Sequence, residues 1–158
     1  MTFRLLAATP DHFASMIAGE ALGDGTALAA TPVAGAEVLA MLAGLAVAIA
    51  EQLSPSAWLM ISDDEVVGLL SVTAFVDGDV VQIGYGVAPC AQGRGHARSA
   101  VAALLEWARG NGRVSAVVAE TSVDNIASQR VLERNGFART GERLDEEDGL
   151  LFCWRAQV

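Results

Sequence analysis

A glycine-rich segment between a strand pattern and a helix pattern is the feature that most limits which folds this chain can adopt. Residues 80–87 match a β-strand, Gly93-Arg94-Gly95 follows a proline, and residues 97–108 place apolar side chains on one helical face. Glycines let backbone amides approach a ligand closely, and a helix start offers unpaired N–H groups and a positive dipole end. The segment therefore predicts an α/β fold with an anion site suited to a pyrophosphate.

The other apolar patterns predict a sheet of mixed direction. Strands are expected at residues 3–6, 57–61, 66–74, 114–121, 137–144 and 150–155, and helices at 10–18, 36–52 and 124–134, the last capped by Asp124. Asp63-Asp64, Asp77-Gly78 and Asn135-Gly136 are turn signals. The order is β-α-α-β-β-β-α-β-α-β-β, which makes about seven strands and four helices.

Two segments depart from simple amphipathic patterns. Residues 19–35 lack periodicity and carry Gly, Thr and Pro, and a loop of that length is usually functional or mobile. Residues 38–50 are all apolar between Glu37 and Glu51, which is too short a run to span a bilayer and predicts a buried helix. No linker or repeat interrupts the chain, so residues 1–158 are expected to form a single domain.

The charge distribution limits the partners of the protein. The chain has ten arginines, no lysine and nineteen Asp and Glu residues, which give a net charge of −9. Residues 1–93 hold one arginine and ten of the carboxylates, whereas residues 94–158 hold the other nine of each. A broad nucleic-acid surface is therefore not expected. The arginines favour a localised anion site, and the acidic remainder favours a cationic partner.

The sequence also carries expectations about location. It lacks the charged start and apolar stretch of a signal peptide, and we predict a cytoplasmic protein without membrane association. The two cysteines, Cys90 and Cys153, show no metal-ligand spacing and fit a reducing compartment, so no metal is expected.

Two motifs resemble one known enzyme family. Gln92-x-x-Gly95-x-Ala97 resembles the acetyl-CoA signature Q/R-x-x-G-x-G/A of the GNAT N-acetyltransferases, and residues 83–89 resemble the strand that precedes it in that family. Downstream, Asn125-x-x-Ser128-x-x-Val131-Leu132-x-x-x-Gly136-Phe137 resembles the family's second motif. The resemblance covers about residues 80–137, and the bacterial enzymes that acetylate ribosomal-protein N-termini look like the nearest branch.

The resemblance implies a GNAT-like fold, acetyl-CoA as cosubstrate and no metal. It implies acetyl transfer to a primary amine, on a peptide N-terminus or a small molecule, by direct attack in a ternary complex. A backbone N–H near Val87 would stabilise the oxyanion, and the side chain of His96 is expected to pack. The residues implied to bind the cosubstrate are Tyr85, Gly86, Val87, Gln92, Gly93, Arg94, Gly95, His96, Ala97, Arg98 and Asn125.

The implied catalytic residues are Glu120 and Ser128. Glu120 ends a strand five residues before Asn125, where the related enzymes place the base that takes a proton from the amine. Ser128 could donate a hydrogen bond to the leaving sulfur. Many relatives use a tyrosine seven residues after the motif asparagine, and this chain has Leu132 there.

Other interpretations stay open at this point. The tyrosine's absence favours a non-catalytic acyl-CoA-binding or sensor module, whereas Glu120 favours an enzyme. A nucleotide-binding module would also use a glycine loop, but Arg98 stands where the dinucleotide fingerprint has its third glycine. The acceptor amine is unspecified, residues 1–75 and particularly 19–35 are expected to shape its pocket, and a homodimer is left open.

Overall fold

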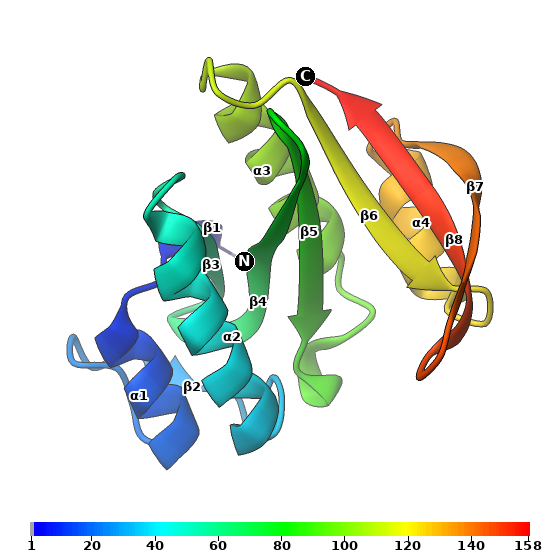
Figure 1. Ribbon diagram of the computed structural model, residues 1–158. Coiled ribbons are helices and arrows are strands. Elements are labelled where there is room, and N and C mark those ends of the chain that lie inside the picture. The colour runs from blue at the N-terminus through cyan, green and yellow to red at the C-terminus, as the bar shows by residue number, and fades with distance from the viewer. Residues whose placement is uncertain (1) are drawn as a thin grey trace. The chain divides into compact units, whose positions relative to one another are not determined.

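The computed structural model describes residues 2–158, and within them the chain forms a mixed sheet with helices (Figure 1). The strands are β1 (Phe3–Ala7), β2 (Ala27–Leu28), β3 (Ala57–Ser62), β4 (Glu65–Asp77), β5 (Val80–Val87), β6 (Ala116–Ser122), β7 (Ala138–Asp145) and β8 (Gly149–Gln157). The helices are α1 (Pro10–Ala18), α2 (Ala36–Ala50), α3 (His96–Arg109) and α4 (Ile126–Arg134), with a short 3-10 turn, η1 (Pro89–Ala91).

The strand order confirms the predicted mixture of directions. Along the sheet the order is β1-β3-β4-β5-β6-β8-β7, and β2 pairs with β4 off this path. The β1–β3, β3–β4, β6–β8 and β7–β8 pairs are antiparallel, whereas β5 and β6 run parallel. Parallel neighbours need a long crossover, and α3 lies in the segment that connects β5 to β6.

Contacts divide the chain into two compact units. Unit 1 contains residues up to Thr73 together with Tyr85–Ala100, and unit 2 contains Ala74–Gly84 together with Val101–Val158. In unit 1, α1 and α2 contact each other, and Phe13, Met16 and Leu39 pack with Leu59 and Leu69 of the sheet. In unit 2, Trp154 of β8 is buried and its Nε1 donates to Thr121 Oγ1 at 2.9 Å.

The start of α1 shows how the local sequence defines an element. Thr9 Oγ1 accepts a hydrogen bond from the His12 N–H at 3.2 Å, and His12 Nδ1 accepts one from the Thr9 N–H at 3.1 Å. Pro10 occupies the first turn, where its missing N–H costs nothing. Gly19 ends the helix with a φ of 73°, the left-handed conformation that glycine adopts without strain. The helix predicted at 10–18 is confirmed.

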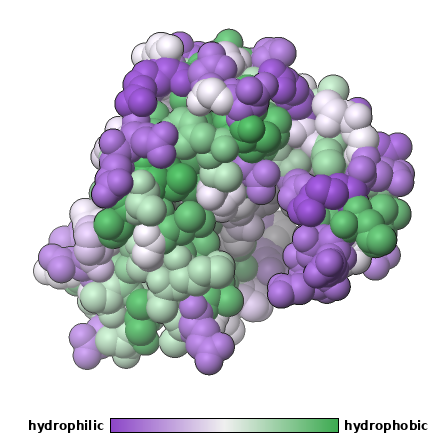
Figure 2. All heavy atoms as spheres, viewed as in Figure 1, coloured by the Kyte–Doolittle hydropathy of each residue, from purple (hydrophilic) through white to green (hydrophobic). Residues whose placement is uncertain are grey.

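The apolar helix α2 is less buried than its composition predicts. Leu39 and Ile49 are buried, but Val38, Met41 and Val47 are 46%, 62% and 57% exposed. Figure 2 shows apolar atoms on the surface where Figure 1 draws α2. The expectation of a buried helix is therefore wrong for one face of α2. No helix in the described part of the chain has both the length and the apolar character that a bilayer crossing requires.

Two further sequence expectations need correction. Residues 2–158 form eight strands, one more than predicted, because Ala27 and Leu28 pair in parallel with Glu65 and Val66 inside the predicted loop. Two residues are too few to show a period, so the pattern could not reveal this strand. Asn125 caps α4, whereas the residue pattern predicted its neighbour Asp124. Asp and Asn are about equally good caps, so residue type alone does not decide between adjacent positions.

Candidate functional site

The glycine loop lies in unit 1 between β5 and α3, as predicted. Gly93 and Gly95 have φ values of 78° and 82°, which lie in the left-handed region. A Cβ added to either glycine would meet no heavy atom within 4 Å. These glycines are therefore required by backbone conformation and not by crowding. The open space around them leaves the loop backbone accessible.

Hydrogen bonds fix the turn before the glycines to the end of β5 and to β4. Gln92 Nε2 donates to the Val87 carbonyl at 3.2 Å, and the Ala88 N–H donates to the Val67 carbonyl at 2.7 Å. The first helical hydrogen bond of α3 is donated by the Ser99 N–H to the Gly95 carbonyl at 3.0 Å. The N–H groups of the turn before it cannot be satisfied from within the helix. The loop thus presents backbone donors at a helix start.

The side chain of His96 packs inside unit 1. It is 3% exposed, and its ring stacks on Phe3 with centroids 5.8 Å apart and planes 12° apart. Burial lowers the pKa of His96 from its usual 6.5, and the nearby charge of Arg94 lowers it further. The ring is therefore neutral at pH 7, and only the backbone of His96 is available to a ligand.

The residues before the loop form the end of β5. Tyr85, Gly86 and Val87 are each partly buried. The Gly86 carbonyl oxygen would lie 2.7 Å from a Cβ built on Gly68, so glycine at 68 allows this close approach of the backbone. From Tyr85 to Arg98 the predicted cosubstrate residues of unit 1 thus form one continuous strand–turn–helix segment.

In unit 2, Glu120 forms a two-pronged ion pair that sequence reasoning missed. Arg143 Nε lies 2.6 Å from Glu120 Oε2, and Arg143 Nη2 lies 2.9 Å from Glu120 Oε1. Arg143 Nη1 also lies 3.3 Å from Asp145 Oδ1. The Glu120 carboxylate raises the pKa of Arg143 above its already high usual value, so the guanidinium stays charged.

The strand register explains this pair. Glu120 of β6 and Gly141 of β7 both lie opposite Cys153 of β8, and Arg143 is two residues further along β7. Residues two apart on a strand share a face, so Arg143 reaches Glu120 diagonally across β8. A register shift between Arg139 and Gly141 sets this alignment. Nothing in the residue pattern reveals such a shift, which is why the pair could not be predicted.

The thiol beside this ion pair stays protonated. Cys153 Sγ lies 3.9 Å from Glu120 Oε2. Burial raises the pKa of Cys153, and the Glu120 carboxylate raises it further. A protonated thiol is a poor nucleophile, so Cys153 is a neighbour of the carboxylate and not a reacting group.

The second motif forms the junction between β6 and α4. Asn125 Oδ1 accepts from the Ser128 N–H at 3.1 Å, which is the cap of the helix. Gln129 Nε2 donates to the carbonyls of Ser122 and Val123, at 3.1 Å each, and so ties α4 to the end of β6. Ser128 is partly exposed, whereas Leu132, one turn further, is fully buried. The position of the relatives' tyrosine is thus a core position here.

Within residues 2–158, no three His, Cys, Asp or Glu residues gather in a way that could hold a metal ion. Cys90 is exposed at η1, and its backbone N–H donates to Thr31 Oγ1 at 3.0 Å. This bond joins the predicted loop of residues 19–35 to the turn before Gly93.

Comparison with known proteins assigns the family. The family model of the acetyltransferase (GNAT) domain matches residues 2–138, and the chain belongs to this family. No curated protein is similar enough in sequence to match the chain. The family is one of acetyltransferases, which confirms the expected class of enzyme and disfavours a module without catalysis.

Solved structures share the fold across the whole chain. RimL, a ribosomal L7/L12 α-N-protein acetyltransferase in complex with coenzyme A, is 20% identical with a TM-score of 0.75, covering 100% of this chain and 95% of RimL. A Salmonella typhimurium acetyltransferase that modifies the N-terminal serine of L7/L12 is 19% identical with a TM-score of 0.74, covering 100% and 96%. The aminoglycoside acetyltransferase AAC(6')-Ib with coenzyme A is 19% identical with a TM-score of 0.67, covering 99% and 94%. The predicted GNAT-like fold is confirmed.

Proposed function

We propose that this protein moves an acetyl group from acetyl-CoA to a primary amine on a peptide N-terminus or a small molecule. The observation that carries this proposal is the glycine loop at the start of α3, which has left-handed glycines and open space around them. The family assignment supports the reaction class. Some neighbours in fold act on a protein N-terminus and one on aminoglycosides, which supports an amine acceptor.

The proposed cosubstrate site uses mainly backbone groups. The N–H groups from Gly93 to Arg98 would hold the pyrophosphate, and the charges of Arg94 and Arg98 would attract the outer phosphates. The backbone of Tyr85–Val87 and the Asn125 side chain would contact the pantetheine arm. The Gln92 side chain bonds the Val87 carbonyl, so its proposed role is to hold the loop in shape for the ligand.

The proposed reaction is direct transfer. The neutral amine adds to the thioester carbonyl, and a backbone N–H near Val87 stabilises the oxyanion of the tetrahedral intermediate. The intermediate collapses to the amide as the C–S bond breaks, and the second proton of the nitrogen passes to the departing sulfur or to water. An alkylammonium must first lose a proton, which Glu120 would accept directly or through water. Ser128 would donate a hydrogen bond to the departing sulfur. The raised pKa of Cys153 supports a route without an acyl-enzyme on that thiol.

Several finer expectations belong to the same proposal. We propose that residues 1–158 act as a single domain in the cytoplasm and that residues 19–35 shape the acceptor pocket. A homodimer is compatible with this function. A gel-filtration measurement combined with light scattering would test the oligomeric state.

The decisive experiment measures thiol release from acetyl-CoA with a panel of amines. The panel would hold a peptide with N-terminal serine, an aminoglycoside, spermidine and free amino acids. Because the chain has no lysine, the enzyme itself adds no ε-amine to the assay. We expect thiol release with at least one amine. Calorimetric binding of CoA without release would indicate a non-catalytic module, and binding of NAD or ATP in place of CoA would indicate a nucleotide-binding module.

A further inference from the structure

The Arg143–Glu120 pair poses a problem for a catalytic base. Both oxygens of the Glu120 carboxylate accept from Arg143, at 2.6 and 2.9 Å, and the Glu120 side chain is 22% exposed. The fork of the guanidinium therefore fills positions from which another donor would reach the two carboxylate oxygens. A base must lie within hydrogen-bond reach of the proton that it takes. The pair is therefore a resting arrangement, from which Glu120 is released when it meets an amine.

The acceptor brings a competing cation to the same carboxylate. An alkylamine near neutral pH is mostly an ammonium ion, which has three donors and a full positive charge. The ammonium reaches the same two oxygens only where the fork of the guanidinium does not occupy them. The two cations therefore compete for hydrogen bonds to Glu120.

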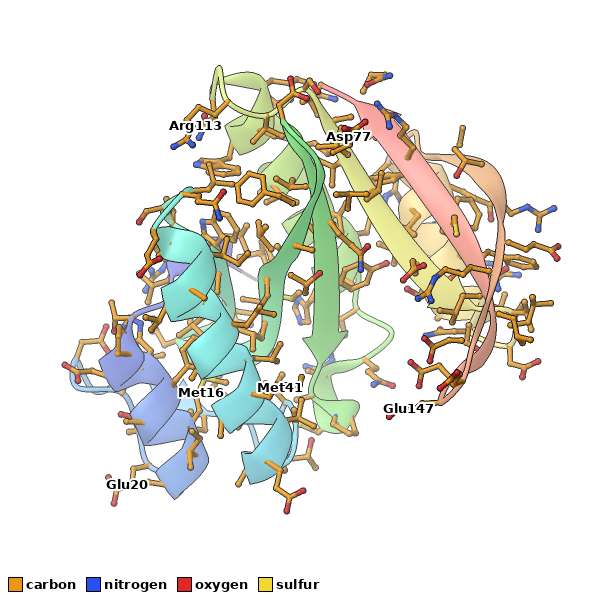
Figure 3. The ribbon with its side chains drawn as sticks, in the orientation of Figure 1. Met16, Glu20, Met41, Asp77, Arg113 and Glu147 are labelled. Atoms are coloured by element: carbon orange, nitrogen blue, oxygen red, sulfur yellow. The ribbon has the colours of Figure 1, made fainter. Side chains whose placement is uncertain are left out.

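A second carboxylate is already in place to receive the guanidinium. Asp145 Oδ2 accepts from the N–H groups of Glu147 and Asp148, at 3.1 and 2.9 Å, which fixes the side chain in the turn of the β7–β8 hairpin. Its other oxygen, Oδ1, lies 3.3 Å from Arg143 Nη1. These turn N–H groups lower the pKa of Asp145, and Arg143 lowers it further, so the carboxylate stays ionised. Figure 3 marks this turn by its label on Glu147.

We propose that Arg143 is an internal competitor that the acceptor must displace. In the resting protein its guanidinium covers Glu120. An incoming alkylammonium takes that place, and Arg143 moves toward Asp145. No covalent bond changes in this exchange, and the guanidinium keeps an anionic partner throughout. Glu120 then accepts the proton from the ammonium. The Arg143 side chain is 49% exposed, which leaves room for the movement.

This exchange makes Arg143 a specificity-determining residue. An acceptor that carries a positive amine can replace the guanidinium, whereas an uncharged nucleophile cannot. The inference rests on the proposed function, since it takes Glu120 as the base. Arg143 lies on a strand outside both sequence motifs.

The first test separates KM from kcat. We expect Arg143→Ala to lower the KM for the best amine of the panel about three- to fivefold, the scale of a partly exposed ion pair, with kcat not reduced. Arg143→Lys keeps the charge but loses the two-pronged contact, so its KM should lie between those of the wild type and Arg143→Ala. Arg109→Ala is the matched control, because Arg109 is 50% exposed and pairs with Glu106 on α3. Its KM should equal that of the wild type.

The second test adds the missing group back. Methylguanidinium should inhibit Arg143→Ala competitively against the amine and should affect the wild type much less. Its binding to Arg143→Ala, measured by NMR titration, should be lost in the Arg143→Ala, Glu120→Gln double variant. This binding does not depend on turnover, so it separates a failure of this inference from a failure of the proposed reaction.

Other effects of these variants on kcat or KM would overturn the proposal. If Arg143→Ala lost kcat and methylguanidinium restored it, Arg143 would position Glu120 and not compete with the acceptor. An unchanged KM in Arg143→Ala would also contradict competition. Should Arg143→Ala not fold, Asp145→Asn provides the same test, because removing the receiving charge should raise the amine KM two- to threefold. An unchanged KM in Asp145→Asn would then refute the exchange.

Discussion

At the scale of single residues, Glu120 is the side chain on which the proposed chemistry depends. Glu120→Gln keeps the shape of the side chain but cannot accept a proton. We expect kcat/KM at neutral pH to fall on the order of 10²-fold, the usual effect of a positioned base. Calorimetric affinity for acetyl-CoA should change little. An unaltered pH–rate profile in this variant would show that the base is another group or water.

Ser128 offers a clean test of assistance to the leaving sulfur. The cap of α4 uses the backbone N–H of Ser128 and not its hydroxyl, so Ser128→Ala leaves that hydrogen bond intact. If the hydroxyl donates to sulfur, kcat should fall more than the affinity for CoA. A fully active Ser128→Ala enzyme would show that the thiolate leaves without this side chain.

Restoring the relatives' phenol at position 132 is not a useful complement to that test. Leu132 is completely buried in unit 2. A tyrosine there would overfill the core and lower the free energy of unfolding by about 1–3 kcal/mol. The missing tyrosine is therefore a change of packing as well as of chemistry.

At the scale of elements, the glycine loop makes the most direct prediction about the cosubstrate. Gly95→Glu adds strain at a φ of 82° and a negative charge beside the proposed pyrophosphate. We expect a severe loss of acetyl-CoA affinity by calorimetry. An affinity within twofold of the wild type would show that the loop is not part of the cosubstrate site. Gly44→Ala is the control, because Gly44 lies in α2 and a Cβ added there would meet no heavy atom within 4 Å outside the helix backbone. It should retain full affinity and gain up to about 1 kcal/mol in stability.

The elements themselves were largely predictable, and the exceptions have physical causes. Caps and turn residues such as Thr9 and Gly136 act locally, so the predicted bounds of α1 and the end of α4 agree with the structure. Contacts that depend on register are not local. The Glu120–Arg143 pair joins residues 23 apart through a third strand and a register shift. The roles of the site residues stay predictions until the variants are measured.

At the scale of the whole molecule, His96 makes stability depend on pH. Its pKa in the folded state lies below the usual 6.5, mainly because of burial. The unfolded chain therefore binds a proton more readily, and lowering the pH below about 6.5 favours unfolding. We expect the free energy of unfolding to decrease between pH 7.5 and pH 5, and His96→Gln to weaken this dependence. Asp24 and Asp145 have lowered pKa values too, but they titrate below 3.8 and act outside this range. Denaturant titrations at several pH values would measure the free energy of unfolding. An equal dependence of this free energy on pH in the wild type and in His96→Gln would contradict the assignment to His96.

The bond from the Cys90 N–H to Thr31 Oγ1 bears on how this protein could acquire new acceptors. Residues 19–35, which we propose shape the acceptor pocket, are the segment that would be varied to change the substrate preference. The Thr31 hydroxyl fastens this segment to the turn before the glycine loop, and the pairing of Ala27 and Leu28 with β4 fastens it to the sheet. A transplanted loop without Thr or Ser at position 31 would lose the first of these bonds, beside the proposed cosubstrate site. An exchanged loop is therefore constrained at Thr31 as well as at the β2–β4 pairing.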